Sequence, residues 1–205
     1  MTVKGIPQSE ITGIILAGGR GSRMGGVDKG LVPLRGAPMI THVIARLKPQ
    51  VGALLINANR NQVDYARLGF PIVPDQFSGF LGPLAGVASG MQAAATPYVV
   101  TVPCDSPLLP FDLVARLARA LTGEQAEIAV AHDGERAHPV FLLVRRELGA
   151  DLLDFLGAGG RKIDQWFTRH RLAVADFSDS AQAFINVNHA EERTALEARL
   201  AETGS

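Results

Sequence analysis

The sequence has one cysteine, no surplus of charge of either sign and no long hydrophobic run. Because Cys104 has no second cysteine to pair with, no intrachain disulfide can form, and a reducing, cytoplasmic compartment is favoured. Lys plus Arg equals Asp plus Glu at 20 each, so the sequence lacks the basic surplus typical of nucleic-acid binding. The longest apolar runs are too short to span a bilayer, and the first residues contain no apolar signal segment. We therefore expect neither nucleic acid nor a membrane among the partners.

What the sequence does have is enough apolar material for a core. Its 205 residues are 47% hydrophobic, which suits one globular domain. The 22 glycines exceed average usage and predict many turns or close backbone approaches.

Short apolar runs alternate with amphipathic stretches along the chain. We expect strands at 11–16, 53–56, 71–73, 98–102, 128–132, 139–144, 172–175 and 184–187. We expect helices at 38–48, 62–68, 83–95, 111–121, 148–156, 163–170 and 190–201. Residues 133–136 are turn-like and predict a hairpin or an irregular strand pair. The alternation predicts a single Rossmann-like α/β domain in three layers, with a mainly parallel sheet covered on both faces.

Ligands of open α/β sheets bind beyond the carboxyl ends of the strands, which directs attention to a glycine-rich segment after the first expected strand. Residues 18–26 read Gly-Gly-Arg-Gly-Ser-Arg-Met-Gly-Gly. Such a loop can turn its backbone N–H groups toward an anion, and Arg20, Arg23 and Lys29 add positive charge. This pattern favours a triphosphate site over the alternative of a flexible surface turn.

Two common phosphate loops do not match this segment. A dinucleotide fingerprint needs a third glycine where Met24 stands, and Asn57 replaces the acidic residue expected after the second strand. A Walker A loop needs Lys directly after its last glycine, but Gly26 is followed by Val27 and Asp28. A different class of nucleotide site is therefore indicated.

Polar residues follow the other expected strands. Asp105 lies between two prolines that stiffen its loop, and it is either a ligand for Mg²⁺ or a carboxylate that caps a turn. Asp75 could accept both N–H groups of a guanine edge, contact the sugar or bind the metal. Asn57 either contacts the nucleotide or tolerates a strand-end turn. Gly82 precedes Pro83 at a helix start, which either receives an anion or base edge or simply begins the helix.

Three stretches occur in order: Leu-Ala-Gly-Gly at 16–19, Arg-Met-Gly-Gly at 23–26 and Asp-Lys-Gly-Leu at 28–31. Together they resemble the signature of the molybdenum cofactor guanylyltransferases. The glycine loop, Arg-Met-Gly and lysine are shared with the wider nucleotidyltransferase superfamily. The Leu-Ala-Gly-Gly form is similar to the guanylyl branch, whereas related cytidylyltransferases more often carry Ala-Ala-Gly. The resemblance spans nearly the whole chain.

The resemblance implies a fold of the nucleotide-diphospho-sugar transferase type. It implies one nucleotidyltransferase domain over 1–205, with a nucleotide-binding part at about 11–120 and an acceptor-side part at about 121–205. The residues implied to bind the nucleotide are Leu16, Ala17, Gly18, Gly19, Lys29, Asn57, Asp75, Gly82 and Asp105. The implied catalytic residues are Arg23, Lys29 and Asp105, with Asp105 as the metal ligand.

The resemblance also implies where the acceptor binds. Arg161, Asn186 and Asn188 match positions near the molybdopterin acceptor in the family. This sequence departs from the family at His189-Ala190, where Thr-Pro is usual, and so lacks a good N-cap for the following helix.

The reaction that the resemblance implies is the transfer of GMP from GTP to the terminal phosphate of molybdenum-molybdopterin, dependent on Mg²⁺, with pyrophosphate released. A phosphate monoester has a second pKa of about 6, so the nucleophile needs no general base at neutral pH. The alternatives are a molybdopterin cytidylyltransferase, a sugar-phosphate nucleotidyltransferase, or a non-catalytic GTP-binding regulatory module. Further expected partners are the proteins that supply molybdopterin and those that mature molybdoenzymes.

Overall fold

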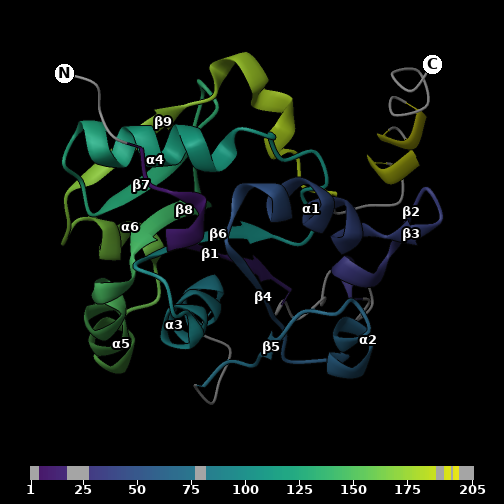
Figure 1. Cartoon of the computed structure of the whole chain (residues 1–205), viewed down its shortest axis with the longest axis horizontal. Coiled ribbons are helices and arrows are strands. Elements are labelled where there is room, and N and C mark those ends of the chain that lie inside the picture. Colours follow the sequence, from purple (N-terminus) through teal and green to yellow (C-terminus); the bar gives the residue numbers. More distant parts are fainter. Residues whose placement is uncertain (1–4, 18–27, 77–81, 188–191, 195, 199–205) are drawn as a thin grey trace.

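A computed structural model describes residues 5–17, 28–76, 82–187, 192–194 and 196–198. Its centre is a seven-stranded sheet in the order β5-β4-β1-β6-β8-β7-β9 (Figure 1). The strands are β1 (Ile11–Leu16), β4 (Ala53–Asn57), β5 (Ile72–Val73), β6 (Tyr98–Pro103), β7 (Ile128–His132), β8 (Ala137–Arg145) and β9 (Leu172–Asp176). Only β8 runs opposite to the others, because it pairs antiparallel with both β6 and β7. This confirms the expected mainly parallel α/β sheet.

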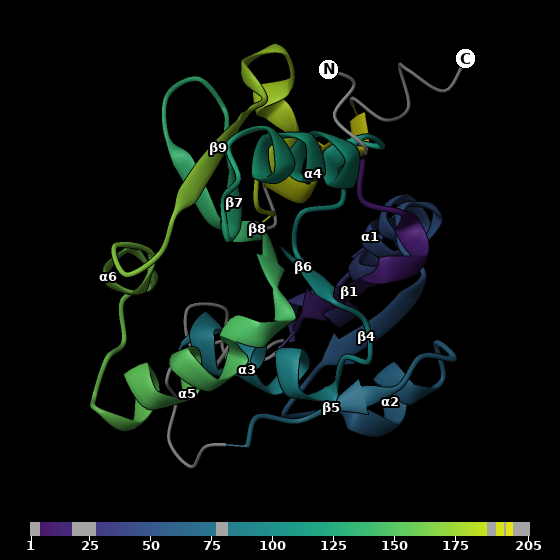
Figure 2. The ribbon, with the colours of Figure 1, turned by 60° about the vertical axis from the view of Figure 1, so that its left-hand side comes forward.

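Helices cover both faces of the sheet, so the fold has three layers (Figures 1 and 2). The helices are α1 (Met39–Leu47), α2 (Gln62–Ala66), α3 (Pro83–Ala93), α4 (Leu113–Gly123), α5 (Gly149–Gly157) and α6 (Ile163–Phe167). Short 3₁₀ turns are η1 (Gln8–Glu10), η3 (Lys29–Leu31), η4 (Lys48–Gln50), η5 (Arg146–Leu148) and η6 (Ser178–Phe184).

Side chains of β1 alternate between two apolar clusters. Ile15 lies in one cluster with Val43 of α1 and Leu117 of α4, and Ile14 lies in the other with Val87 of α3 and Trp166 of α6. The period of two along a strand makes this division inevitable for a buried central strand. Full burial of each aliphatic side chain contributes roughly 1.5–3 kcal/mol to stability. The two helical layers are therefore held by the same strands.

The expected elements match the observed ones to within two residues at each end, with three larger differences. The strand expected at 184–187 is wrong: residues 178–184 form η6, and Val187 donates its backbone N–H to the Asp105 carbonyl rather than to a strand. Its apolar pattern reflects packing, since Phe184 contacts the rings of His138, Phe141 and Phe177. Helix α6 ends at Phe167, three residues before the expected end.

The third difference is a small hairpin that the sequence analysis did not predict. Strands β2 (Pro33–Leu34) and β3 (Ala37–Pro38) pair across a turn in which Arg35 and Gly36 both have positive φ. Two positive φ values define a type I′ turn, which Asn-Gly signals more strongly than Arg-Gly. The expected hairpin around 133–136 is confirmed as the β7–β8 pair. The described residues of the expected closing helix, 192–194 and 196–198, are helical.

Candidate nucleotide site

Three neighbouring strands end together at one edge of the sheet. Leu16 of β1 is in register with Asn57 of β4 and with Pro103 of β6. The hydrogen bonds continue one residue further, because Ala17 N–H donates to the Asn57 carbonyl and Cys104 N–H donates to the Leu16 carbonyl. The residues expected at the nucleotide site therefore leave the sheet side by side. Gly18, Gly19 and Arg23 lie outside the described residues.

Lys29 and Asp105 form an ion pair at this edge. Lys29 Nζ lies 2.9 Å from Asp105 Oδ2, and the Asp105 side chain is only 10% exposed. Lys29 comes from η3 and Asp105 from the turn after β6, so residues 76 positions apart meet. A cation beside a buried carboxylate compensates for the loss of its hydration and offers positive charge to a phosphate.

A second polar cluster surrounds Asp75. Asn57 donates an amide N–H to Asp75 Oδ1 at 2.9 Å, and Asn59 donates to Asp75 Oδ2 at 2.8 Å. The backbone N–H of Asp75 donates in return to Asn59 Oδ1 at 2.7 Å. Both carboxylate oxygens are thus oriented and still have acceptor capacity. Sequence reasoning missed Asn59, although its spacing of two from Asn57 was a usable signal.

The two carboxylates stand at opposite ends of the site. Asp75 follows β5 and Asp105 follows β6, with β4 and β1 between them in the sheet. Three strand spacings amount to about 14 Å. One Mg²⁺ with ligands at about 2.1 Å does not bridge that distance, whereas a nucleoside triphosphate is long enough to approach both.

Helix α3 begins at the edge where Asp75 lies. Gly82 is its N-cap, with φ of 72° and ψ of −164°, a conformation that is essentially restricted to glycine. Pro83 follows at the first helical position, as expected. Gly86, one turn further on, faces Asn57, and a Cβ there would lie 2.3 Å from Asn57 Oδ1. The first turn of α3 therefore approaches the Asn57–Asp75 pair closely.

The residues expected on the acceptor side do not lie together: Asn186 lies beside the Asp105 turn, and Arg161 lies in the turn between α5 and α6. Ser106, fully buried, donates its hydroxyl to Asn186 Oδ1 at 2.7 Å, and Val187 N–H donates to the Asp105 carbonyl at 2.9 Å. Asn186 is therefore tied to the Asp105 turn, while Asn188 lies outside the described residues. Arg161 instead donates to the carbonyls of Leu156 and Gly160 within the α5–α6 turn. That turn lies on the far side of the molecule from α2 (Figures 1 and 2).

Cys104 lies next to Asp105 but is not suited to nucleophilic catalysis. It is buried, and burial followed by the charge of Asp105 raises the pKa of its thiol well above the usual range. A neutral thiol is a poor nucleophile, so the expectation of a small buried residue is confirmed.

Asp133 on the β7–β8 turn has a pKa shifted in the opposite direction. Backbone N–H groups, led by that of Arg136, and the His138 ring lower its pKa.

The donor set at Asp105 suits Mg²⁺. Within the part of the chain that the structure describes, no three His, Cys, Asp or Glu side chains gather as a metal cage. Mg²⁺ commonly takes one or two protein carboxylates and completes its shell with phosphate oxygens and water. Lys29 contacts Oδ2 of Asp105, and Oδ1 is the second oxygen of the same carboxylate.

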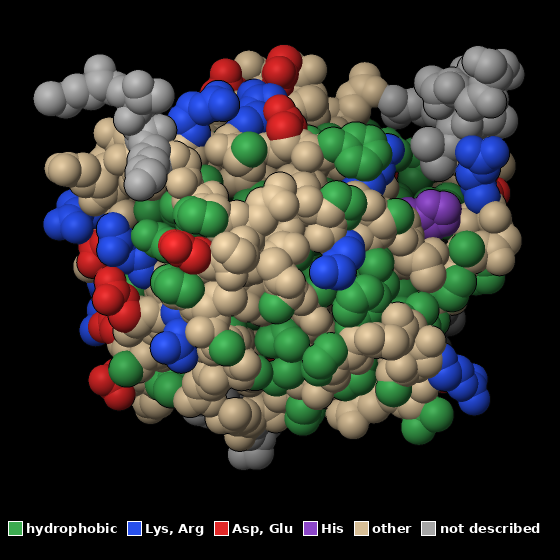
Figure 3. All heavy atoms as spheres, viewed as in Figure 1, with side chains coloured by type: hydrophobic (Ala, Val, Ile, Leu, Met, Phe, Trp, Pro, Cys, Tyr) green, Lys and Arg blue, Asp and Glu red, His purple; other side chains and the backbone are tan. Residues whose placement is uncertain are grey.

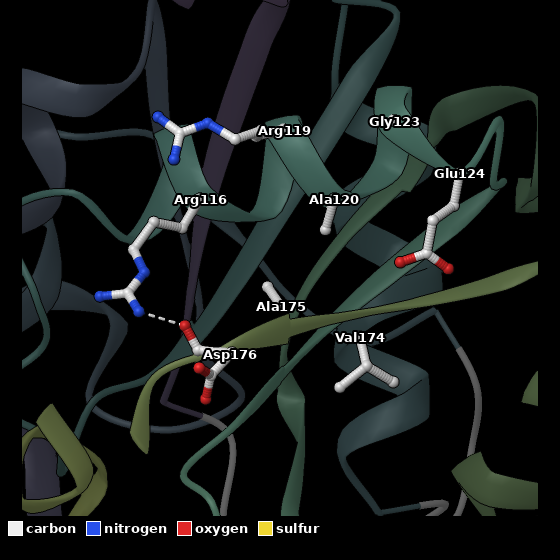
Figure 4. A pocket seen from close by; sticks show the side chains of 8 residues that line it. All are labelled: Arg116, Arg119, Ala120, Gly123, Glu124, Val174, Ala175 and Asp176. Carbon is white, nitrogen blue, oxygen red and sulfur yellow. Dashed lines mark hydrogen bonds between the residues drawn. The ribbon is translucent and has the colours of Figure 1, made fainter. Parts of the chain in front are cut away.

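A hollow of about 340 Å³ lies elsewhere, between α4 and β9 (Figure 4). Arg116 on its wall is held by Asp179 and by the Asp176 carbonyl, and its guanidinium lies 4.2 Å from the centre of the Phe177 ring. None of the expected site residues lines it, and we do not assign the nucleotide there.

The face in Figure 3 shows acidic and basic side chains interspersed on its left side, as the balanced charge suggests.

Residues 13–174 match the family model described as MobA-like NTP transferase domain. The chain is 53% identical to a molybdenum cofactor guanylyltransferase of Shewanella sp. (strain MR-4), over 93% of this chain and 97% of the relative. It is 52% identical to the protein of that name from Shewanella loihica, over 94% and 98%. A solved structure from Archaeoglobus fulgidus, molybdopterin-guanine dinucleotide biosynthesis protein A, superposes with a TM-score of 0.77. At 17% identity, covering 93% of this chain and 99% of that one, it supports the fold.

Proposed function

The chain belongs to the family of the MobA-like NTP transferase domain, and on that basis we propose that it transfers GMP from GTP to the terminal phosphate of molybdenum-molybdopterin, releasing pyrophosphate. The Lys29–Asp105 pair beside the end of β1 is the observation that carries this proposal. Cys104, the residue before Asp105, donates its backbone N–H to the carbonyl of Leu16, two residues before the glycine segment that the sequence predicts to hold the triphosphate. The names of the relatives indicate the guanylyl donor and the molybdenum cofactor product.

In this proposal, different residues bind different parts of the nucleotide. Asp75, held by Asn57 and Asn59, receives the base or the ribose, and Gly82 lets α3 begin beside it. Leu16 and Ala17 lead into Gly18 and Gly19, whose backbone N–H groups bind phosphate oxygens. Asp75 follows β5 and Asp105 follows β6, two strands that lie about 14 Å apart across the sheet, which suits a base at one end and phosphates at the other.

Catalysis in this proposal depends on positioning and on charge. Lys29 and Arg23 offset the negative charge that accumulates on the departing pyrophosphate. Asp105 would hold Mg²⁺, which neutralises triphosphate charge when bound. The acceptor phosphate is already largely dianionic at neutral pH, so the site needs no base to deprotonate it. Asn186, tied to the Asp105 turn through Ser106, orients the acceptor together with Asn188.

The proposal extends to the cellular setting. Within the described residues, no helix is long and apolar enough to cross a membrane. We place the reaction in the cytoplasm, where the single thiol stays reduced. Proteins that supply molybdopterin and proteins that mature molybdoenzymes are the expected partners before and after the reaction.

The direct test is mass spectrometry of the product formed from GTP, Mg²⁺ and molybdenum-loaded molybdopterin, with CTP and UTP as competing donors. We expect the guanine dinucleotide and stoichiometric pyrophosphate. Preference for CTP would indicate a cytidylyltransferase, and GTP binding without pyrophosphate release would indicate a regulatory module. Lys29→Ala and Asp105→Ala should each lower turnover by about 10²–10³-fold while circular dichroism stays native. Near-normal turnover in Asp105→Ala would contradict the metal assignment.

A further inference from the structure

Asp28, the residue before Lys29, is a buried carboxylate whose hydrogen bonds hold the turn carrying that lysine. Its Oδ1 accepts the backbone N–H of Gly30 at 3.3 Å and the hydroxyl of Tyr65, and its Oδ2 accepts an amide N–H of Asn61 at 2.9 Å. Asp28 is also the N-cap of η3. Burial of a carboxylate is costly unless donors compensate it, and here both oxygens have them.

The donors come from an element distant in sequence. Tyr65 belongs to α2, is fully buried and lies 37 residues from Asp28. Burial raises the pKa of its hydroxyl far above the usual range, so the group remains a donor. The Tyr65 hydroxyl itself donates to the Asp28 carboxylate, so Tyr65 does more than exclude solvent from it.

Asn61 also supports Asp28, because its side chain donates to the Asp28 carboxylate instead of capping its own helix. It stands at the N-cap of α2, where an asparagine side chain usually accepts a backbone N–H of its own helix. Here it makes no such cap, and its amide donates to Asp28 instead. Its φ of 49° is in the left-handed region, which asparagine tolerates better than most residues.

Gly30 shows how tightly this turn is packed. A Cβ at Gly30 would lie 2.5 Å from the Tyr65 hydroxyl oxygen and 3.3 Å from Cβ and Sγ of Cys104. The turn that carries Lys29 is therefore enclosed between α2 on one side and the residue preceding Asp105 on the other. Its backbone has little room to shift.

We propose that Asp28 is the positioning residue for Lys29, with Tyr65 and Asn61 as the supports through which α2 fixes the lysine opposite Asp105. The Lys29 side chain is long and 30% exposed, so its placement depends on where its backbone is held. A point charge stabilises a developing negative charge best when it needs no reorganisation. The effect on turnover rests on the proposed function, whereas the effect on Lys29 itself does not.

The kinetic test uses Tyr65→Phe, which removes only the hydroxyl. We expect kcat to fall about tenfold, the worth of one charge-assisted hydrogen bond, with KM for GTP changed less than about threefold. The same substitution in a Lys29→Ala background should cost less than about twofold, because a positioning residue has nothing left to position. The other tyrosine, Tyr98, lies at the amino end of β6, so Tyr98→Phe should leave kcat unchanged.

A second variant protects the test against misfolding. Asn61→Gly keeps the positive φ accessible while it removes the amide donor, and it should also lower kcat, by about threefold to tenfold. An equal loss from Tyr65→Phe with and without Lys29 would overturn the proposal, as would wild-type kcat in both Tyr65→Phe and Asn61→Gly.

A chemical readout separates this inference from the proposed function. Reductive methylation followed by peptide mass spectrometry measures the reactivity of Lys29 against exposed Lys48 in the same molecule. We expect the Lys29/Lys48 rate ratio to rise at least about threefold in Tyr65→Phe and to stay constant in Tyr98→Phe. An unchanged ratio in Tyr65→Phe overturns the inference. If the wild-type protein transfers no GMP, the proposed function fails while this ratio still decides the role of Asp28.

Discussion

Among single residues, Gly86 and Gly90 of α3 both face the sheet where a methyl group has no room. A Cβ at Gly86 would lie 2.3 Å from Oδ1 of Asn57, and one at Gly90 would lie 2.1 Å from Cδ1 of Ile14. The first neighbour orients Asp75, and the second belongs to the apolar core. The same substitution at the two positions should therefore affect different properties.

Gly86→Ala should weaken GTP binding about tenfold, because the displaced Asn57 no longer orients Oδ1 of Asp75. Titration calorimetry with GTP measures this. Gly90→Ala is the matched control: overpacking against Ile14 should lower the free energy of unfolding by about 1–3 kcal/mol and leave the Kd for GTP unchanged. Equal changes in Kd for both variants would contradict the role assigned to Asn57.

The thiol of Cys104 gives a prediction about pH. Its pKa in the folded chain is raised, while the unfolded chain ionises near 8.5. Above pH 8.5 the folded state therefore binds more protons than the unfolded state, and stability falls as pH rises. Between pH 7.5 and 9.5 the wild-type protein should lose about 1 kcal/mol more than Cys104→Ala in urea unfolding. Parallel losses in both proteins would show that the thiol does not titrate in this way.

Among the elements, the segment after η6 shows how tertiary contacts replace a strand. Its apolar residues predicted a strand at 184–187, yet Val187 bonds to the Asp105 carbonyl and Asn186 to the Ser106 hydroxyl. The segment therefore connects the acceptor side to the loop that carries the metal candidate.

Ser106→Ala tests this connection. It removes the hydroxyl that holds Asn186, so KM for the molybdopterin acceptor should rise about fivefold to tenfold. KM for GTP should stay within about twofold, because Asn57 and Asp75 belong to other loops. Steady-state kinetics with each substrate varied in turn gives both values. A rise confined to the GTP term would exclude an acceptor-side role for this segment.

At the scale of the whole molecule, the two apolar clusters share the strands that separate them. Adjacent residues of β1, Ile14 and Ile15, belong to opposite clusters. Loss of either helical layer would expose to water the face that it covers on this shared sheet. The nucleotide-binding and acceptor-side parts should therefore unfold together.

Two natural probes test that expectation. The only tryptophan, Trp166, is buried in one cluster, and the only cysteine, Cys104, is buried in the other. Trp166 fluorescence and pulse labelling of Cys104 should give one urea midpoint, which saturating GTP and Mg²⁺ should shift upward. Two separate midpoints would indicate two independent units rather than a single domain.

The sequence alone determined the class of fold and most of the elements. Strand and helix periods come from local patterns of apolar residues, and Gly82 and Pro83 marked the start of α3. The residues expected at the nucleotide site could be named because parallel strands end at a common edge. The family resemblance depended on ordered short motifs, which a single sequence displays directly.

Only the tertiary structure decided which of those residues meet. The Lys29–Asp105 pair and the Tyr65 and Asn61 contacts of Asp28 join residues 33 to 76 positions apart, and no local pattern encodes such contacts. The same holds for Asn186, which packing placed against Ser106 although its segment forms no strand. Local sequence patterns specify backbone conformation and burial, whereas the partner of a buried polar group depends on how distant elements pack.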